Sequence, residues 1–175
     1  KRALLRHLCG AEAGREEAAA AAALLLERRL LARPKEFGIV IHALGRRSLW
    51  QDAVGVLRGM RHQRREPGPE AYTTAIGACQ SGKQWEVALR LLLEASERTL
   101  RPGVLAYNSV LGSFDAATPW EWIARMLWQM RRGGVEPDAV TCSTAISRCE
   151  QSQAWAKAFD LLRQMRQSSL TPNAI

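Results

Sequence analysis

The residues of this sequence with the most distinctive chemistry are four cysteines and three histidines. They are Cys9, Cys79, Cys142 and Cys149, with His7, His42 and His62. A zinc site needs such ligands in close pairs, and the sequence has no C-x-x-C pair. It also has no nucleophile–base pair and no glycine-rich phosphate loop. We therefore expect buried free thiols, no metal or cofactor, and no enzymatic activity in this segment.

Arginine carries most of the positive charge. Lysine and arginine together number 25 against 17 acidic residues, which gives a net charge of +8. Guanidinium groups form paired hydrogen bonds with phosphate, so nucleic acid is the first partner to consider. Many arginines also follow predicted helices, where the helix dipole favours cations without any ligand. Both explanations stay open. The longest apolar run, residues 18–26, is too short to cross a bilayer, so no membrane insertion is expected.

The elements that would position these side chains repeat with a period of 35 residues. Tryptophan occurs at that spacing at Trp50, Trp85, Trp120 and Trp155, and proline at Pro67, Pro102, Pro137 and Pro172. A third column of the same register contains Phe37, Tyr72, Tyr107 and Cys142. Three columns in one register predict a tandem repeat, in which each unit must bury its apolar face against its neighbours.

Each unit divides into two amphipathic helices. In the third unit the apolar positions are Tyr107, Val110, Leu111 and Phe114, followed by Trp120, Ile123, Met126, Leu127 and Met130. This spacing is typical of helices, and no strand-like alternation occurs. The predicted fold is an all-α, right-handed α-solenoid of stacked 35-residue helix-turn-helix repeats. The units are expected at 34–68, 69–103, 104–138 and 139–173, with a degenerate N-terminal capping repeat at 1–33. Because the sequence stops where another unit would begin, we expect either that further repeats follow or that a partner covers this end.

Short motifs predict where some of these helices begin and how they pack. Thr118 before Pro119 and Trp120 indicates a helix cap, and Ser48 is expected to cap the helix that starts at Trp50. Alanines in the middle of the second helices, Ala53, Ala88 and Ala158, indicate close helix approach. Ile123 stands at that position in the third unit, so looser or shifted packing is expected there.

The sequence motifs of the units resemble those of the pentatricopeptide repeat (PPR) family of organellar RNA-binding proteins. The third unit opens with Tyr-Asn-Ser-Val-Leu at 107–111 and closes with Met-Arg-Arg-Gly-Gly-Val-Glu-Pro-Asp at 130–138. The tetratricopeptide repeat is one residue shorter and has its tryptophan in the first helix. Tryptophan opening the second helix is similar to the PPR variant of dinoflagellates and their relatives. The resemblance implies a mitochondrial or plastid protein.

In this family one RNA base is read per repeat by the fifth and last residues, while the second residue packs against bases. The resemblance therefore implies that Asn108 with Asp138 reads uracil and that Ser143 with Asn173 reads adenine. Thr73 with Gly103 favours purine, and Gly38 with Gly68 resembles no code. The base-packing residues are Leu105 and Val140. Candidate phosphate contacts are Arg46 and Arg148 in the groove, with Arg131 and Arg132 at a helix end.

Simpler explanations exist for several of these residues. The tryptophans share a stripe with leucines and methionines, which favours packing over base stacking. Asn108 and Asp138 could each cap a helix. The sequence therefore supports two functions. The first is RNA processing, stability or translation through binding of single-stranded or ribosomal RNA. The second is a scaffold subunit that contacts other subunits of an organellar ribosome, photosynthetic or respiratory complex.

Overall fold

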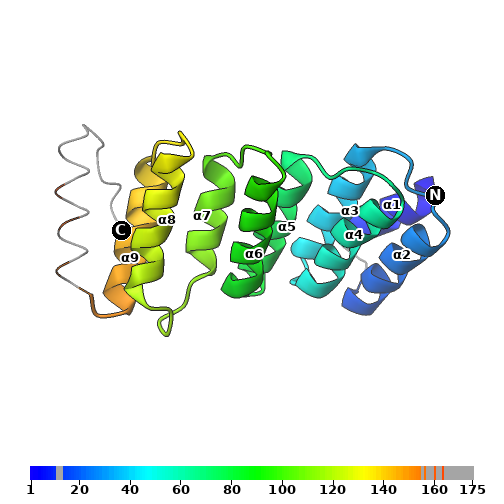
Figure 1. The fold of residues 1–175 in the computed structure, drawn as a ribbon. Helices are drawn as coiled ribbons and strands as arrows, with labels where there is room; N and C mark the ends of the chain where they lie inside the picture. Colours follow the sequence, from blue (N-terminus) through cyan, green and yellow to red (C-terminus); the bar gives the residue numbers. More distant parts are fainter. Residues whose placement is uncertain (11–13, 155, 157–159, 161–162, 164–175) are drawn as a thin grey trace.

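The computed structural model describes residues 1–10, 14–154, 156, 160 and 163. Within these residues the chain forms nine α-helices and no strand, which confirms the all-α fold (Figure 1). They are α1 (Arg2–Cys9), α2 (Arg15–Glu27), α3 (Pro34–Gly45), α4 (Trp50–His62), α5 (Pro69–Ser81), α6 (Trp85–Glu97), α7 (Val104–Ser113), α8 (Trp120–Arg132) and α9 (Ala139–Gln151). The predicted second helix of the last unit, with Trp155 and Ala158, lies outside the described residues.

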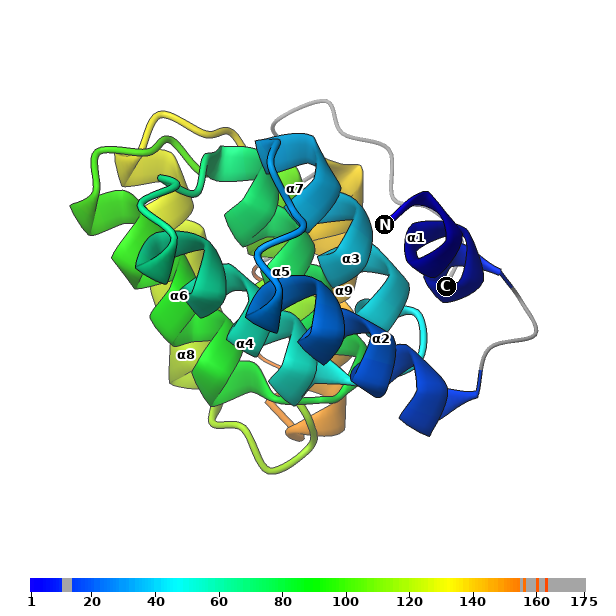
Figure 2. The ribbon, with the colours of Figure 1, turned by 90° about the vertical axis from the view of Figure 1, so that its right-hand side faces the viewer.

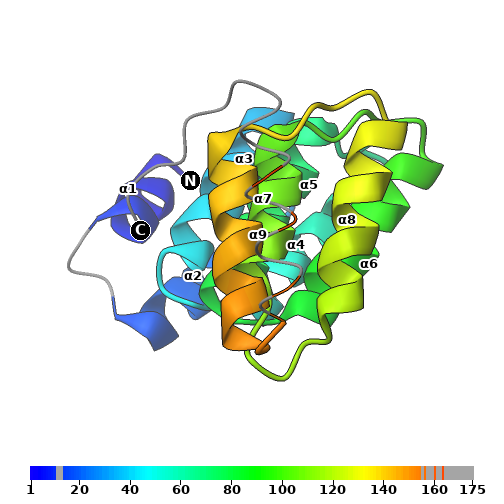
Figure 3. The same ribbon diagram turned by 90° about the vertical axis from the view of Figure 1, so that its left-hand side faces the viewer.

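The helices form two layers. Figure 3 shows the first helices of the units, α3, α5, α7 and α9, in one layer, and the second helices α4, α6 and α8 in the other. Figure 2 shows the same two layers from the N-terminal end. Neighbouring first helices pack directly against each other, whereas α4, α6 and α8 do not contact one another closely. The first-helix layer is therefore the inner side of the solenoid, where a bent stack has its shortest spacing.

The periodic tryptophans serve packing where the structure describes them. Trp50, Trp85 and Trp120 are the first residues of α4, α6 and α8. The ring of Trp85 meets Phe114 edge to face, with centroids 5.8 Å apart, and meets Trp122 at the same centroid distance. Aromatic pairs in this range add to the free energy of apolar burial. The packing role expected for this column is thus seen directly at Trp85.

Small residues allow the helices to approach closely. Ala53 and Ala88 are fully buried in the middle of α4 and α6. Between α3 and α5, a methyl group built on Gly45 would lie 3.0 Å from the Cβ atom of Ala78. In the third unit the buried side chain is Ile123, and α7 contacts α8 less extensively than α3 contacts α4. The looser packing expected from isoleucine is what the helices show.

Left-handed residues end the helices at the same 35-residue period. Arg29, Arg64, Thr99 and Gly134 follow the second helices with φ between 48° and 73°. In each turn the next amide reaches back to a carbonyl of the last helical turn; for example, Leu100 N donates to Ala95 O at 3.1 Å. This is the Schellman arrangement, in which the residue after the left-handed one packs on the helix. Leu100 does so, lying against the core.

Replacing Thr99 with glycine is expected to raise the free energy of unfolding by about 1 kcal/mol. Thr99 has φ 59°, a conformation that a β-branched residue adopts only with strain and that glycine adopts freely. Urea unfolding followed by circular dichroism measures the change. Gly134→Ala at the matching position of the next turn should shift stability the other way. A Thr99→Gly protein no more stable than the wild type would contradict the strain.

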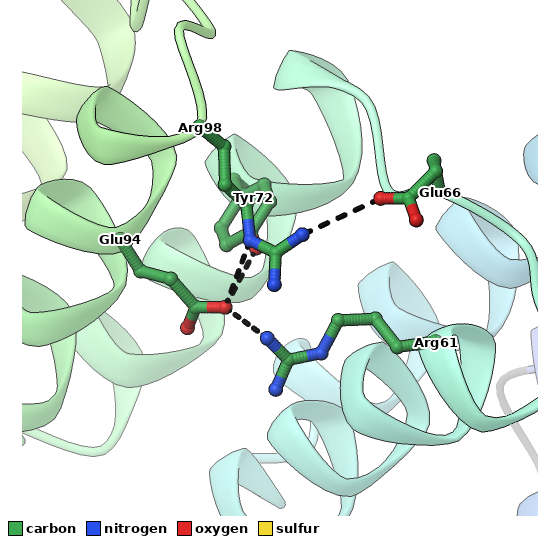
Figure 4. Close-up of polar contacts among 5 residues, drawn as sticks. All are labelled: Arg61, Glu66, Tyr72, Glu94 and Arg98. Carbon is green, nitrogen blue, oxygen red and sulfur yellow. Dashed lines mark hydrogen bonds and ion pairs between the residues drawn. The ribbon is translucent and has the colours of Figure 1, made fainter.

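A shared carboxylate joins the first two units. Glu94 Oε1 accepts hydrogen bonds from the Arg61 guanidinium, from the Tyr72 hydroxyl at 2.9 Å and from Arg98 Nε at 3.3 Å (Figure 4). Arg98 also reaches Glu66 at 3.4 Å. Burial, assisted by the Glu94 carboxylate, raises the pKa of Tyr72, so the phenol remains a donor. The network connects α4, α5 and α6 by their side chains.

Both predicted hydroxyl caps are wrong. The helix at 120 starts after Pro119, and the Thr118 hydroxyl bonds Asp115 instead, donating to Oδ1 at 2.8 Å and accepting from its amide at 3.1 Å. Because α7 ends at Ser113, residues 114–119 form a long link, and within it the Asp115 carboxylate accepts a hydrogen bond from the Thr118 hydroxyl. Ser48 has φ 57° and ends the preceding helix turn, while Leu49 is the residue before Trp50.

Candidate nucleic-acid interface

The inner layer presents apolar side chains to solvent. Leu105 is 67% exposed in the first turn of α7, and Val140 is 52% exposed in the first turn of α9. Two adjoining hollows lie along this layer. One, of about 940 Å³, is lined by α3 and α5 residues that include Lys35, Gly38 and Glu70, and the other, of about 320 Å³, includes Thr73 and Leu105. Apolar groups exposed in a groove favour contact with a flat, partly apolar ligand.

The side chains of Asn108, on α7, and Asp138, at the start of α9, form a hydrogen-bond network with Thr141. Asn108 Nδ2 donates to Asp138 Oδ1 at 3.3 Å, and the Thr141 hydroxyl lies 2.6 Å from Asn108 Oδ1. Asp138 caps α9 by accepting from the Thr141 amide at 2.7 Å. Burial acts to raise the pKa of Asp138, but the hydrogen bonds from Thr141 and Asn108 outweigh it and hold the pKa below its usual value. The carboxylate is therefore ionised at neutral pH.

This geometry separates the two helix-cap explanations. Asp138 does cap a helix, whereas Asn108 lies in the second turn of α7, whose N-cap is Gly103. Asn108 therefore uses one amide hydrogen in its bond to Asp138 and one oxygen lone pair in its bond to Thr141. One amide hydrogen and one lone pair stay available for another partner. Sequence reasoning missed Thr141. Its signal was the spacing of a capping-box residue three positions after Asp138.

The structure places the other predicted base-reading residues that it describes, but shows none of them in contact with its predicted partner. Thr73 lies on α5, and its hydroxyl donates to the Pro69 carbonyl at 2.8 Å. Ser143 is half-buried on α9. Its predicted partner Asn173 lies outside the described residues. Gly103 contributes only the cap of α7. Of the predicted pairs, the structure therefore brings Asn108 and Asp138 together.

The candidate phosphate contacts occupy different surroundings. Arg148 bridges the inner layer: its guanidinium donates to the Gly112 carbonyl at 3.2 Å and to Gln151 at 2.7 Å. Arg46 is exposed and lines the smaller hollow. Arg131 and Arg132 are exposed at the end of α8 in the outer layer, where the Arg132 guanidinium lies 5.1 Å from the ring of Trp128. Of the four candidates, Arg46 is the one that lines a hollow together with Thr73 and Leu105.

The described cysteines are unreactive. Burial raises the pKa of Cys79 to about 11 and raises the pKa values of Cys142 and Cys149 as well, so all three are thiols at neutral pH. The part of the chain that the structure covers contains no cluster of metal-binding side chains. None of the described helices is long and apolar enough to cross a membrane.

Comparison with known proteins supports the repeat assignment. A family model described as a pentatricopeptide repeat domain matches residues 125–175, and a PPR repeat model matches residues 37–64. No curated protein matches the chain. The crystal structure of the pentatricopeptide repeat protein PPR10 from maize is 28% identical with a TM-score of 0.68, covering 90% of this chain and 23% of that one.

Two further structures share the fold. PPR10 in complex with an 18-nt psaJ RNA element is 19% identical with a TM-score of 0.71, over 88% of this chain and 23% of that one. The PPR domain of Arabidopsis thaliana protein-only RNase P 1, in complex with tRNA, is 12% identical with a TM-score of 0.73. The match covers 91% of this chain and 84% of that one. The chain spans about a quarter of PPR10. With its period, its helix order and these matches, the chain belongs to the pentatricopeptide repeat family.

Proposed function

We propose that this chain binds single-stranded RNA along its inner layer, as part of a mitochondrial or plastid protein that acts in RNA processing, stability or translation. The observation that carries the proposal is the contact between Asn108 and Asp138, near the starts of the same two helices that expose Leu105 and Val140. The likeness to PPR10 and to the RNase P domain, both solved with RNA, supports it.

The arrangement suggests how a base would be held. Leu105 and Val140 stand one unit apart on the inner layer, so a base could lie between their apolar faces. Asn108 would then meet the edge of that base with the amide hydrogen and lone pair that the network leaves over. Stacking and edge contacts contribute about 1–3 kcal/mol per base in single-stranded recognition. Ser143 and Asn173 would read the neighbouring base.

The test is binding of the purified chain to short single-stranded RNAs with and without a central U-A step, over a series of salt concentrations. We expect a preference for U-A that Asn108→Ala reduces about fivefold to tenfold, since it removes hydrogen bonds worth about 1 kcal/mol each. Gln129→Ala in the outer layer removes an amide of similar chemistry and should leave the preference unchanged. Equal binding of both RNAs by the wild type would refute base reading.

One observation favours a scaffold role as the second candidate. Gly38 and Gly68 stand at both reading positions of the first unit, and a methyl group built on either would meet nothing within 4 Å. The hollow of about 940 Å³ beside them thus receives no side chain from either reading position. A protein segment from another subunit of an organellar complex could fill it. Absence of any base preference in the single-strand assay would favour this role.

A further inference from the structure

Arginines accumulate on one edge of the solenoid. The turns that lead from a second helix to the next first helix lie along the same edge (the upper edge in Figure 1). The first three of these turns, residues 28–33, 63–68 and 98–103, contain the arginines that we call the arginine edge: Arg28, Arg29, Arg33, Arg64, Arg65, Arg98 and Arg101. All seven are exposed.

The charge in these turns is unbalanced, and the fourth turn differs from the first three. Glu66 is the one acidic residue in those three turns, whereas the fourth turn, residues 133–138, has Glu136 and Asp138 and no cation. Arg98 pairs with Glu94 and Glu66. The remaining six arginines of the edge form no ion pair with any described carboxylate. The turns themselves are therefore positive at the first three junctions, whereas at the fourth the exposed cations are Arg131 and Arg132 in the last turn of α8.

Helix dipoles account for only some of these positions, since Arg28 and Arg98 are the C-cap residues of α2 and α6. A cation that stabilises a helix end belongs in its last turn, because the effect fades beyond it. The last turns of α2 and α6 contain no basic residue, and Arg33 and Arg101 lie several residues farther on. Arg29 and Arg64 also occupy left-handed positions that glycine would fill with less strain, as Gly134 does in the fourth turn. Six of the seven arginines, exposed and without an ion pair to a described carboxylate, are therefore available to an anionic ligand.

We propose that the arginine edge binds the phosphate backbone of base-paired RNA. Repeated guanidinium groups along a line match a regular polyanion and can bond each phosphate in pairs. The three turns contain no aromatic residue, so they offer none of the stacking surfaces on which single-stranded sites depend. Paired RNA, which presents phosphates and hides its bases, fits such a surface. The arginine edge adjoins the inner layer, because the reading positions Gly68 and Gly103 are the last residues of two of its turns, but its arginines do not line the two hollows of that layer.

The experiment compares two double variants that remove the same charge. Arg29→Gln with Arg64→Gln neutralises two left-handed residues of the arginine edge. Arg15→Gln with Lys83→Gln neutralises two exposed cations elsewhere, and Lys83 is itself left-handed, with φ 52°. Binding of a 20-base-pair RNA duplex is measured against salt concentration, together with a 20-residue polyglutamate peptide. Thermal unfolding of each variant confirms that it is folded.

We expect the edge variant to bind the duplex at least about tenfold more weakly in low salt. The slope of log K against log salt should fall in magnitude by about 1.8, since each lost phosphate contact contributes about 0.9. The control variant should match the wild type, and polyglutamate should bind far more weakly than the duplex. Equal losses in both variants would overturn the proposal, as would equal binding of polyglutamate. The single-strand preference governed by Asn108 is measured separately, so either proposal can fail alone.

Discussion

Substitution of Gly45 by valine is expected to lower the free energy of unfolding by about 2–3 kcal/mol. A Cβ atom at Gly45 would lie 3.0 Å from the Cβ and 3.2 Å from the Cα of Ala78. Both atoms are fixed to the backbone of α5, so no flexible side chain can move aside. The two inner helices would have to separate, and overpacking of this kind typically costs about 1–3 kcal/mol.

Urea unfolding of Gly45→Val beside Gly38→Val measures this effect. Gly38 lies two helical turns earlier in α3, and a Cβ there would meet nothing within 4 Å. Its replacement should therefore be neutral or slightly stabilising, because glycine is a poor helix former. Similar unfolding free energies for the two variants would show that α3 and α5 are free to separate at no cost.

Removal of the Glu94 carboxylate is the second substitution with a large expected effect. In Glu94→Ala, the hydroxyl of Tyr72, a residue only 1% exposed, loses its acceptor, and the Arg61 guanidinium loses its carboxylate. A buried polar group without a partner costs about 1–3 kcal/mol. Since Arg61 and Glu94 are each about one-third exposed, water screens their part of the loss. We expect a total of about 2 kcal/mol.

Two companion variants identify the source of that loss. Glu94→Gln retains an oxygen acceptor for Tyr72 and should lose less than half as much. Glu97→Ala removes an exposed carboxylate of the same helix and should change stability by less than about 0.5 kcal/mol. Combined with Tyr72→Phe, Glu94→Ala gives a double-mutant cycle. A coupling energy near zero would mean that the hydroxyl finds another partner.

The sequence was informative where a pattern repeats and weaker where a single residue decides. The apolar spacing around Tyr107 and Trp120 recurs in every unit, because each must bury the same face, so helix positions followed from it. The start of α8 could not be predicted from this repeated pattern. A threonine before a proline resembles a cap, but the Asp115 carboxylate competes for the Thr118 hydroxyl, and that competition depends on where α7 ends.

The candidate site shows the same division. The pairing of Asn108 with Asp138 was expected from family resemblance, and the structure places the two side chains in contact. The contribution of Thr141 could not be read from that resemblance, since it arises from the cap of α9. The left-handed column was equally hidden, because it mixes arginine (Arg29, Arg64), Thr99 and Gly134, and only backbone geometry unites these residues.

The contact between Thr141 and Asn108 has a consequence for engineering such arrays. Thr141 belongs to the unit after the one that contains Asn108, so the environment of the reading amide is completed across a junction. Units cut at residue 138 and reordered as independent modules would separate Asn108 from half of its network. A transferable cassette should instead run from residue 104 through residue 141. Selectivity in redesigned arrays would then depend on the order of neighbours as well as on the identity of each unit.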